Sequence, residues 1–360
     1  MRFFPGLASL VIAFTGLAAS SSAASAGQAP PDYGMTWSTI GAPGNRLPNA
    51  QEAPAWFQGA NPPGFRWGRV DYSYRLTKTE VTAGVYLEFV RAYLRANPPG
   101  PVGPDTGLSG GLIQVIFGQA TLPNAFREFP ATMSWEFAAR YCNWLHNDKA
   151  TSREAFERGV YDTSTFRYEN DVPLHQTTPA PGAKYWIPSV DEWYKGAYYD
   201  PNKNNGLGGY WMYPGMQDTP LISGLPSAGG QTSAQTFADL AVGSYPGVVS
   251  PWGLLDVSGS EREWSGTIGE RNSASHVFIL GTASLGSATI DRLESGPITG
   301  LFGSPSYGLR IASSVPAPGV GVVCAPLLFA VHRRKRAHGA PRPPARAPSV
   351  SERAQAGPKP

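Results

Sequence analysis

The chain of 360 residues contains very little cysteine and little charge. Its two cysteines, Cys142 and Cys324, lie in a helix-like pattern and in an apolar stretch near the C-terminus, so a disulfide framework is excluded. Charged residues make up 15%, below the roughly one quarter that is usual for soluble domains. By contrast, 42 glycines and 35 prolines predict a loop-rich fold. The 12% of aromatic residues excludes disorder over most of the chain.

The formal net charge of +3 hides an uneven distribution along the chain. Residues 332–360 contain eight Lys or Arg and one Glu, and Arg2 adds a further positive charge. Residues 27–313 therefore carry a net negative charge. An acidic body excludes a basic nucleic-acid groove, and no nucleic-acid partner is expected.

Residues 1–26 have the pattern of a secretory signal peptide. Arg2 provides the positive start, residues 7–17 form an apolar run, and Ala24-Ser25-Ala26 gives a small-x-small cleavage pattern. The alternative is a buried N-terminal helix. The pattern predicts an exported protein that resides in the cell envelope or outside the cell.

Residues 314–336 have a pattern typical of a targeting segment. An uncharged apolar run from Val315 to Val331 would span about 25 Å as a helix, near the lower limit for crossing a bilayer. Val315-Pro316-Ala317-Pro318 at its start and the basic cluster at 332–336 after it resemble the PEP-type sorting signal of exported bacterial proteins, with Ala317 in place of the usual Glu. The resemblance implies sorting and processing machinery as a partner, with transient anchoring in the membrane. The alternative is a plain tail anchor. Residues 337–360 are expected to be disordered.

The intervening residues 27–313 are predicted to form a single α+β domain. Thr82 is placed to cap a helix that runs to about Ala96, and Ser134 a helix that runs to about Asn147. Ser189 and Glu192 form a capping box that starts a third helix. After residue 200 the sequence indicates loops and short strands, so helices early and strands late predict an α+β fold.

Five segments carry residues in a characteristic order. They are Thr79-Glu80-Val81-Thr82 with Tyr86 and Phe89; Pro130 with Ser134-Trp135-Glu136, Ala138 and Tyr141-Cys142-Asn143-Trp144-Leu145; Tyr185-Trp186-Ile187-Pro188-Ser189 with Glu192-Trp193 and Ala197; Val242-Gly243-Ser244 with Trp252-Gly253-Leu254-Leu255-Asp256-Val257, Gly259, Glu263 and Trp264; and Tyr307-Gly308-Leu309-Arg310-Ile311-Ala312. Together they resemble the sulfatase-modifying-factor family, which is the formylglycine-generating-enzyme-like domain. The resemblance implies a variant of the C-type lectin fold.

The resemblance also shows where the chemistry of this family is missing. Its aerobic enzymes bind copper through two cysteines late in the domain, but residues 264–312 contain no cysteine, and Cys142 matches a core position. Copper is therefore not expected. The family's R-G-G-S-W turn is replaced at 279–285, where Ser284 is the clear survivor. A loop that differs from the family's loop is expected beside the usual cleft.

Other metals remain open at this stage. The iron-dependent branch of the family needs a His-x3-His helix, but the histidines of the body, at 146, 175 and 276, contain no such pair. The resemblance implies a calcium site at Glu263, with Ser260 in the place of the family's usual Asn. Because a serine hydroxyl is a poorer ligand than an amide oxygen, the site is weakened.

Aromatic residues on a glycine-flanked loop are candidates for ligand binding. Tyr210, Trp211 and Tyr213 could stack on sugars or cap peptide prolines, and the alternative is that they belong to the core. We therefore expect an exported, non-catalytic module at the cell surface that binds an unknown peptide or glycan or has a structural role. The alternative is a metal-dependent oxidase of the same family that uses non-cysteine ligands on a peptide or small molecule.

Overall fold

The computed structural model describes residues 28–57, 66–97, 107–169, 172–271 and 274–315. The predicted signal peptide, nearly all of the predicted sorting segment and the tail after residue 337 lie outside these residues. All described residues belong to one compact unit. None of the helices in the described ranges is both long and apolar enough to cross a membrane.

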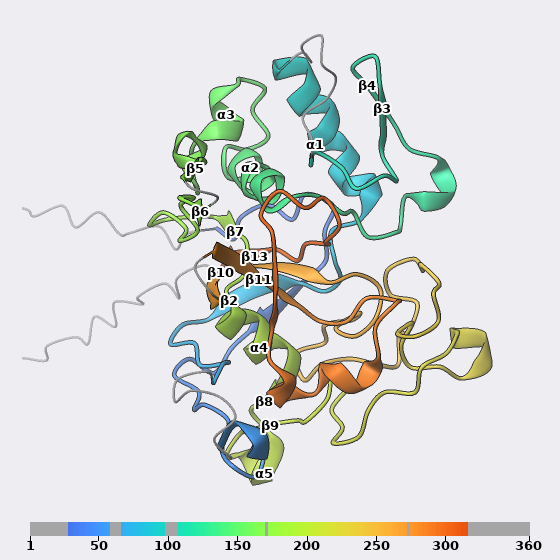
Figure 1. Ribbon diagram of the computed structural model, residues 1–360. Coiled ribbons are helices and arrows are strands. Elements are labelled where there is room, and N and C mark those ends of the chain that lie inside the picture. Colours follow the sequence, from blue (N-terminus) through green and yellow to red (C-terminus); the bar gives the residue numbers. More distant parts are fainter. Residues whose placement is uncertain (1–27, 58–65, 98–106, 170–171, 272–273, 316–360) are drawn as a thin grey trace, which may run out of the picture. The chain divides into compact units, whose positions relative to one another are not determined.

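A four-stranded antiparallel sheet holds together distant parts of the chain. Its strands, in spatial order, are β1 (Trp37–Ile40), β2 (Tyr74–Thr77), β13 (Ala312–Ser314) and β7 (Tyr185–Trp186). Strand β13 is the last described strand, yet it lies between β2 and β7 (Figure 1). The closing segment of the domain is therefore paired with strands from its first and middle parts.

The three predicted helices are confirmed. Helix α1 (Ala83–Ala96) is capped by Thr82, and α2 (Trp135–His146) is capped by Ser134; each hydroxyl oxygen accepts a backbone N–H of the first turn. Helix α4 (Val190–Tyr198) begins with the complete capping box of Ser189 and Glu192. Local sequence was sufficient here because a cap satisfies amide groups that the helix itself leaves unpaired.

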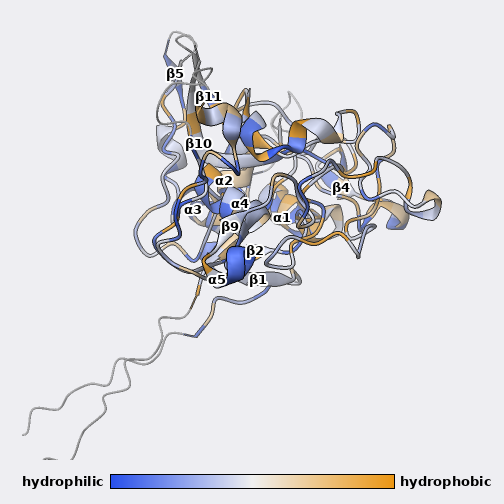
Figure 2. Ribbon diagram, turned by 90° about the horizontal axis from the view of Figure 1, so that it is seen from below, coloured by the Kyte–Doolittle hydropathy of each residue, from blue (hydrophilic) through white to orange (hydrophobic). Residues whose placement is uncertain are grey.

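The remaining elements are short, apart from one hairpin. They are η1 (Pro54–Phe57), β3 (Gln114–Ile116), β4 (Gln119–Thr121), η2 (Asn124–Phe126), α3 (Glu154–Glu157), η3 (Thr163–Thr165), β5 (Tyr168–Glu169), β6 (Val172–Pro173), β8 (Tyr199–Asp200), α5 (Lys203–Gly206), β9 (Gly209–Tyr210), η4 (Pro226–Ala228), β10 (Glu263–Arg271), β11 (Ala274–Leu280), η5 (Ala288–Asp291), η6 (Leu293–Ser295) and β12 (Ile298–Gly300). Figure 2 shows α5 as strongly hydrophilic, as its sequence Lys-Asn-Asn-Gly requires. The prediction of a loop-rich, single-domain α+β fold is confirmed.

Two apolar clusters form the core on the two faces of the four-stranded sheet. Helices α1 and α2 pack into one cluster together with Tyr185 of β7. Helix α4 packs into the other against Tyr74 and Leu76 of β2. Figure 1 shows the same arrangement, with α1 and α2 on one side of the sheet and α4 on the other. The sheet is therefore covered on one face by α1 and α2 and on the other by α4, which follows them in the sequence.

The long hairpin β10–β11 departs from the prediction of short late strands. Strand β10 pairs with β11, and the register shifts between Trp264 and Ile268. Gly266 lies in this irregular stretch, where a Cβ atom would come 2.9 Å from the carbonyl oxygen of Ile187. The close approach of two backbones explains the glycine and fixes β10 against the segment that precedes α4.

Candidate functional site

Three of the five characteristic segments meet at one buried ion pair. The guanidinium of Arg310 donates from Nη2 to Oε1 of Glu263 at 2.9 Å and from Nε to Oε2 at 3.1 Å. The indole Nε1 of Trp193 donates to Oε2 of the same carboxylate at 2.8 Å. The side chains of Arg310 and Glu263 are 0% and 1% exposed. The pair therefore ties together the last strand region, β10 and α4.

The same guanidinium also holds two backbone carbonyls. It donates from Nη1 to the carbonyl oxygen of Thr77 at 2.7 Å and from Nη2 to that of Leu255 at 2.9 Å. Because an arginine offers five N–H donors in a rigid plane, one side chain can bridge several chain segments. Arg310 is a structural centre of the fold.

Two further acids lie close to this ion pair. Burial, followed by the charges of Asp256 and Glu263, raises the pKa of Glu80 well above its usual range. Neither carboxyl oxygen of Glu80 has a hydrogen-bond partner among the described residues. Burial also raises the pKa of Asp256, whose Oδ2 accepts the amide N–H of Gly243 at 2.6 Å. The cluster therefore contains one ion pair and, beside it, a Glu80 carboxyl whose pKa is raised by burial.

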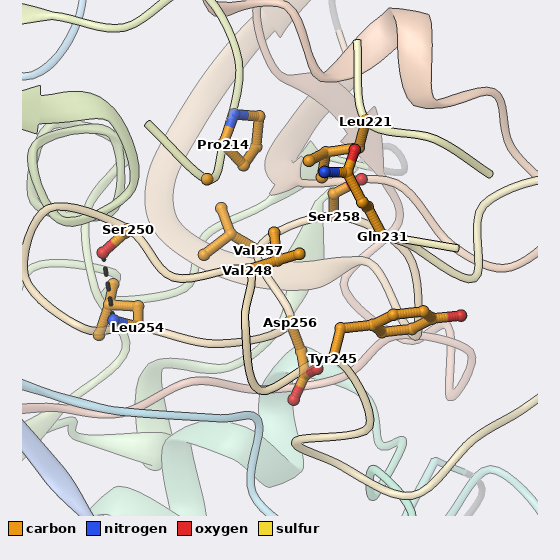
Figure 3. Close-up of a pocket in the computed structure, with 11 residues that line it drawn as sticks. Pro214, Leu221, Gln231, Tyr245, Val248, Ser250, Leu254, Asp256, Val257 and Ser258 are labelled. Atoms are coloured by element: carbon orange, nitrogen blue, oxygen red, sulfur yellow. Dashed lines mark hydrogen bonds between the residues drawn. The ribbon is translucent and has the colours of Figure 1, made fainter. Parts of the chain in front are cut away.

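The hollow beside Asp256 is too small for a substrate. Figure 3 shows residues of the loops that form it, including Tyr245, Leu254 and Ser258 around Asp256. Its volume is about 10 Å³, roughly the space that one water molecule needs. This hollow can accommodate a water but not an organic ligand.

The turn at residues 279–285 is held by hydrogen bonds to two acidic side chains. Thr282 Oγ1 and Ser258 Oγ both donate to the carboxylate of Asp291. Burial raises the pKa of Asp291 to about 7, although these hydroxyls lower it. Nearby, Ser284 Oγ donates to Asp239 at 3.2 Å, and burial, with the charge of Asp239, raises the pKa of Glu261 to about 7. The turn is therefore held by Asp291 and Asp239, which accept hydrogen bonds from Thr282 and Ser284.

An open groove of about 810 Å³ lies between α4, β10 and the loop that precedes β7. Aromatic rings, hydroxyls and a proline-rich loop share its walls. The lining residues are Tyr72, Thr177, Thr178, Pro179, Ala180, Pro181, Gly182, Ala183, Trp186, Ile187, Ser189, Glu192, Gly266, Thr267 and Ile268. Its size and mixed lining match those of small-ligand and peptide sites.

The carboxylate in this groove is fully engaged. Glu192 is 2% exposed, and it accepts from the hydroxyl of Tyr72 at 2.9 Å, from Trp186 Nε1 at 2.9 Å and from the Ser189 amide at 2.7 Å. Burial raises its pKa in spite of these donors. Tyr72 is 52% exposed and Ile268 40%. The groove thus presents apolar and aromatic surface, while Glu192 orients the two rings.

The three aromatic residues predicted to bind a ligand have different environments. Tyr210 is fully buried, and its hydroxyl donates to the carbonyl oxygen of Gly68 at 2.8 Å. Tyr213 is 8% exposed. Trp211 donates to Asp200 at 3.1 Å, and the Lys203 ammonium lies 3.8 Å from the centre of its ring. None of the three is among the groove residues, and ligand binding by them stays a prediction.

The predicted metal ligands are also placed. Glu263 is engaged by Arg310 and Trp193 as described, and Ser260, at φ 59, donates its amide to Ser233 Oγ at 2.8 Å. His175 Nε2 lies 2.8 Å from Glu136 Oε1. Within the described ranges, no group of three histidine, cysteine or acidic side chains is arranged to hold a metal. The calcium site stays a prediction.

Sequence reasoning missed the groove because its walls come from distant segments. Tyr72, the loop 177–183 and Ile268 carry no shared periodicity or motif. The signal that could have pointed to them is the sequence Pro179-Ala180-Pro181-Gly182 directly before a characteristic segment. A rigid loop of this kind beside a helix start is a typical position for a binding site.

Comparisons with known proteins give distant likenesses. No family model matches the chain, and no curated protein matches it. Among solved structures it is similar to the crystal structure of CarF, with 16% identity, a TM-score of 0.46 and coverage of 79% of this chain and 99% of that chain. It is also similar to PvdO from Pseudomonas aeruginosa, with 16% identity, a TM-score of 0.40 and coverage of 78% and 92%. At this degree of likeness, function has to be argued from the residues of the chain itself.

Proposed function

We propose that the domain is a non-catalytic ligand-binding module whose site is the groove between α4, β10 and the loop 177–183. The observation that supports this function is the state of Glu192. It is the carboxylate of the groove wall, and four donors from Tyr72, Trp186 and Ser189 already occupy it. A general acid or base needs a free position toward the substrate. An acid engaged in this way serves to orient the rings that contact a ligand.

The ligand class that fits these walls is an extended peptide or a glycan. Trp186 and Tyr72 offer aromatic surface, and Thr177, Thr178 and Thr267 offer hydroxyls. Aromatic side chains with an apolar face and a polar edge suit both sugar rings and proline-containing peptides. The groove is open to solvent, so a long ligand could extend beyond it.

An array experiment tests this proposal. The full chain is applied to arrays of oligosaccharides and of proline-containing peptides, and the best probe is then titrated against three proteins: the wild type, Tyr72→Ala and Tyr72→Phe. Loss of the exposed ring in Tyr72→Ala should weaken binding at least about tenfold. Tyr72→Phe keeps the ring and should retain most of the affinity. Equal affinity in all three proteins would place the ligand elsewhere and would contradict the proposal.

The family and cellular setting are part of the same proposal. The convergence of characteristic segments on Arg310 supports a fold of the sulfatase-modifying-factor type, without copper. The pattern of residues 1–26 supports export, and that of residues 314–336 supports a sorting signal that holds the chain at the membrane until it is processed. A bound calcium ion at Glu263 and Ser260 belongs to this proposal as well. Elemental analysis of purified protein, with melting curves in chelator, tests whether calcium is bound.

A further inference from the structure

The tip of the hairpin formed by β3 and β4 carries an unusually exposed aromatic ring. The two-residue turn Phe117-Gly118 joins the strands, and the Phe117 side chain is 100% exposed. Its neighbour Ile116 is 56% exposed. In Figure 1 this hairpin stands beside α1 at the edge of the domain. Two large apolar side chains are thus offered to the surroundings from one projecting tip.

The backbone at this tip is unfavourable for a phenylalanine. Phe117 and Gly118 both have positive φ, 49° and 73°. Turns of this kind favour Asn-Gly or Gly-Gly, because residues with bulky side chains resist the left-handed region. A phenylalanine at this position destabilises the backbone, and its ring is not buried in the domain. Strain at such a position indicates that the side chain serves a function outside the folded chain.

The base of the hairpin is firmly held, so the tip is presented rigidly. Ile113 and Ala120 are buried, at 4% and 6% exposure, and belong to the main core cluster. The guanidinium of Arg91, on α1, donates to the carbonyl oxygen of Ala120 at 3.2 Å. The apolar tip is therefore pre-organised rather than collapsed onto the surface.

The charges around the tip have one consistent arrangement. No residue from 107 to 126 is charged, so the whole hairpin and its flanks are neutral. Arg91, which contacts the hairpin, and Arg95 are both exposed and lie one turn apart on α1, and the exposed Glu88, one turn before Arg91, is paired with Lys149. A neutral apolar tip with a basic base matches the depth profile of a bilayer surface, in which acyl chains lie beneath anionic headgroups.

We propose that the tip of the β3–β4 hairpin inserts Ile116 and Phe117 into the interface of a lipid bilayer that contains anionic lipid. A bilayer suits a narrow projection because it needs no complementary shape. A specific protein interface needs roughly 800 Å² on each partner, which a two-residue tip does not provide. This surface is separate from the groove, so neither proposal depends on the other.

The test uses vesicles of phosphatidylcholine and phosphatidylglycerol in a 7:3 ratio. In the full chain carrying Cys324→Ser and Gln119→Cys, an environment-sensitive dye is attached at position 119, which is exposed and next to the tip. Cys142 is buried and is expected to stay unlabelled. We expect the dye emission to shift to the blue with these vesicles and less with pure phosphatidylcholine. Because the dye reports the hairpin itself, binding through the ends of the chain would leave it unchanged.

The decisive variant is Phe117→Asn, which removes the ring and introduces a residue that the turn prefers. We expect the partition coefficient of the hairpin, measured from the dye emission at position 119, to fall about tenfold, since burying a phenylalanine side chain accounts for about that factor. The melting temperature should stay the same or rise. Phe237→Asn is the matched control, because Phe237 is 76% exposed with φ 57° and lies two residues from Asp239; its partition should not change.

Two results would overturn the proposal. One is an unchanged dye emission with vesicles that nevertheless bind the protein, which would place membrane contact elsewhere. The other is equal partition of wild type and Phe117→Asn, with both proteins folded. Either would favour a protein partner for the hairpin.

Discussion

Arg310 and Glu263, which are 47 residues apart in the sequence, form a bidentate ion pair that solvent does not reach. Removing one partner of such a pair leaves an uncompensated buried charge. The resulting loss of folding free energy is far larger than the net contribution of the pair. Arg310 also donates to the backbone carbonyls of Thr77 and Leu255. The fold around the candidate site therefore depends on both residues.

Glu263→Gln should destabilise the domain by about 3–5 kcal/mol, because Arg310 would lose its buried counter-charge. Denaturant unfolding of the full chain, followed by tryptophan fluorescence, measures this free energy. Glu80→Gln is the matched control, since burial raises the pKa of this carboxyl and favours its neutral form, and it should change stability by less than about 1 kcal/mol. Equal losses in both variants would mean that Glu80 is ionised in the folded protein.

Asn143 provides a second stability prediction. Its side chain is fully buried and makes four hydrogen bonds to backbone: it donates to the carbonyls of Phe156 and Tyr161 and accepts from the amides of Val160 and Tyr161. Asn143→Leu should cost at least about 3 kcal/mol, because buried backbone groups would lose their partners. Asn147→Leu, at the half-buried C-cap of α2, should cost about 1 kcal/mol. Chemical denaturation compares the two, and similar losses would contradict the role given to Asn143.

These residues show how much of the structure was readable in the sequence. The caps Thr82, Ser134 and Ser189 predicted the three helices, since capping depends on residues only three positions apart. The role of Arg310 was not predictable in this way. Its partners lie 47 and 233 positions away, and a single sequence contains no signal for pairing over such distances. The order of the segments suggested a family but not the contacts among them.

Asp291 predicts a pH dependence of stability. Its pKa of about 7 in the folded state is raised from 3.8 in an exposed aspartate, mainly by burial. The protonated form is therefore favoured by folding. The stabilisation by the protonated Asp291 is fully present below about pH 4 and is lost as the pH rises through about 7. In Asp291→Asn the side chain is neutral at every pH, so the variant should gain stability relative to wild type between pH 5 and 8.

Melting curves of both proteins over that pH range measure the difference. Other acids with raised pKa values are present in both proteins and cancel in the comparison. A constant difference across the range would show that Asp291 is ionised throughout. A stability of the variant relative to wild type that falls as the pH rises from 5 to 8 would contradict the sign of the shift.

Cys142 predicts a thiol that is inert in the folded protein. The residue is fully buried, and burial raises the pKa of its thiol well above the usual value, so little thiolate forms. In a full chain with Cys324→Ser, a thiol reagent should react only at the rate of unfolding. Rapid labelling of native protein would show that Cys142 is accessible and would reopen a role in chemistry.

The groove illustrates what the sequence did not contain. Tyr210 was predicted to bind a ligand because glycines flank its loop. Its side chain is buried in the structure, where Asn45 Nδ2 donates to its hydroxyl at 2.8 Å. Tyr72 carries no motif and nevertheless lines the groove, because the order of the strands brings it beside Glu192. Exposure of an aromatic residue depends on which distant segment covers it, and local composition gives no information about that.

The central claim is that the groove binds a ligand without changing it. The most direct test is to incubate the best array probe with the full chain under air, with copper, iron or calcium added in turn, and to measure the mass of the recovered probe by mass spectrometry. Saturable binding that Tyr72→Ala weakens, together with an unchanged probe mass, is the predicted result. A probe that is oxidised or cleaved in proportion to protein concentration would contradict the claim and would favour the metal-dependent oxidase.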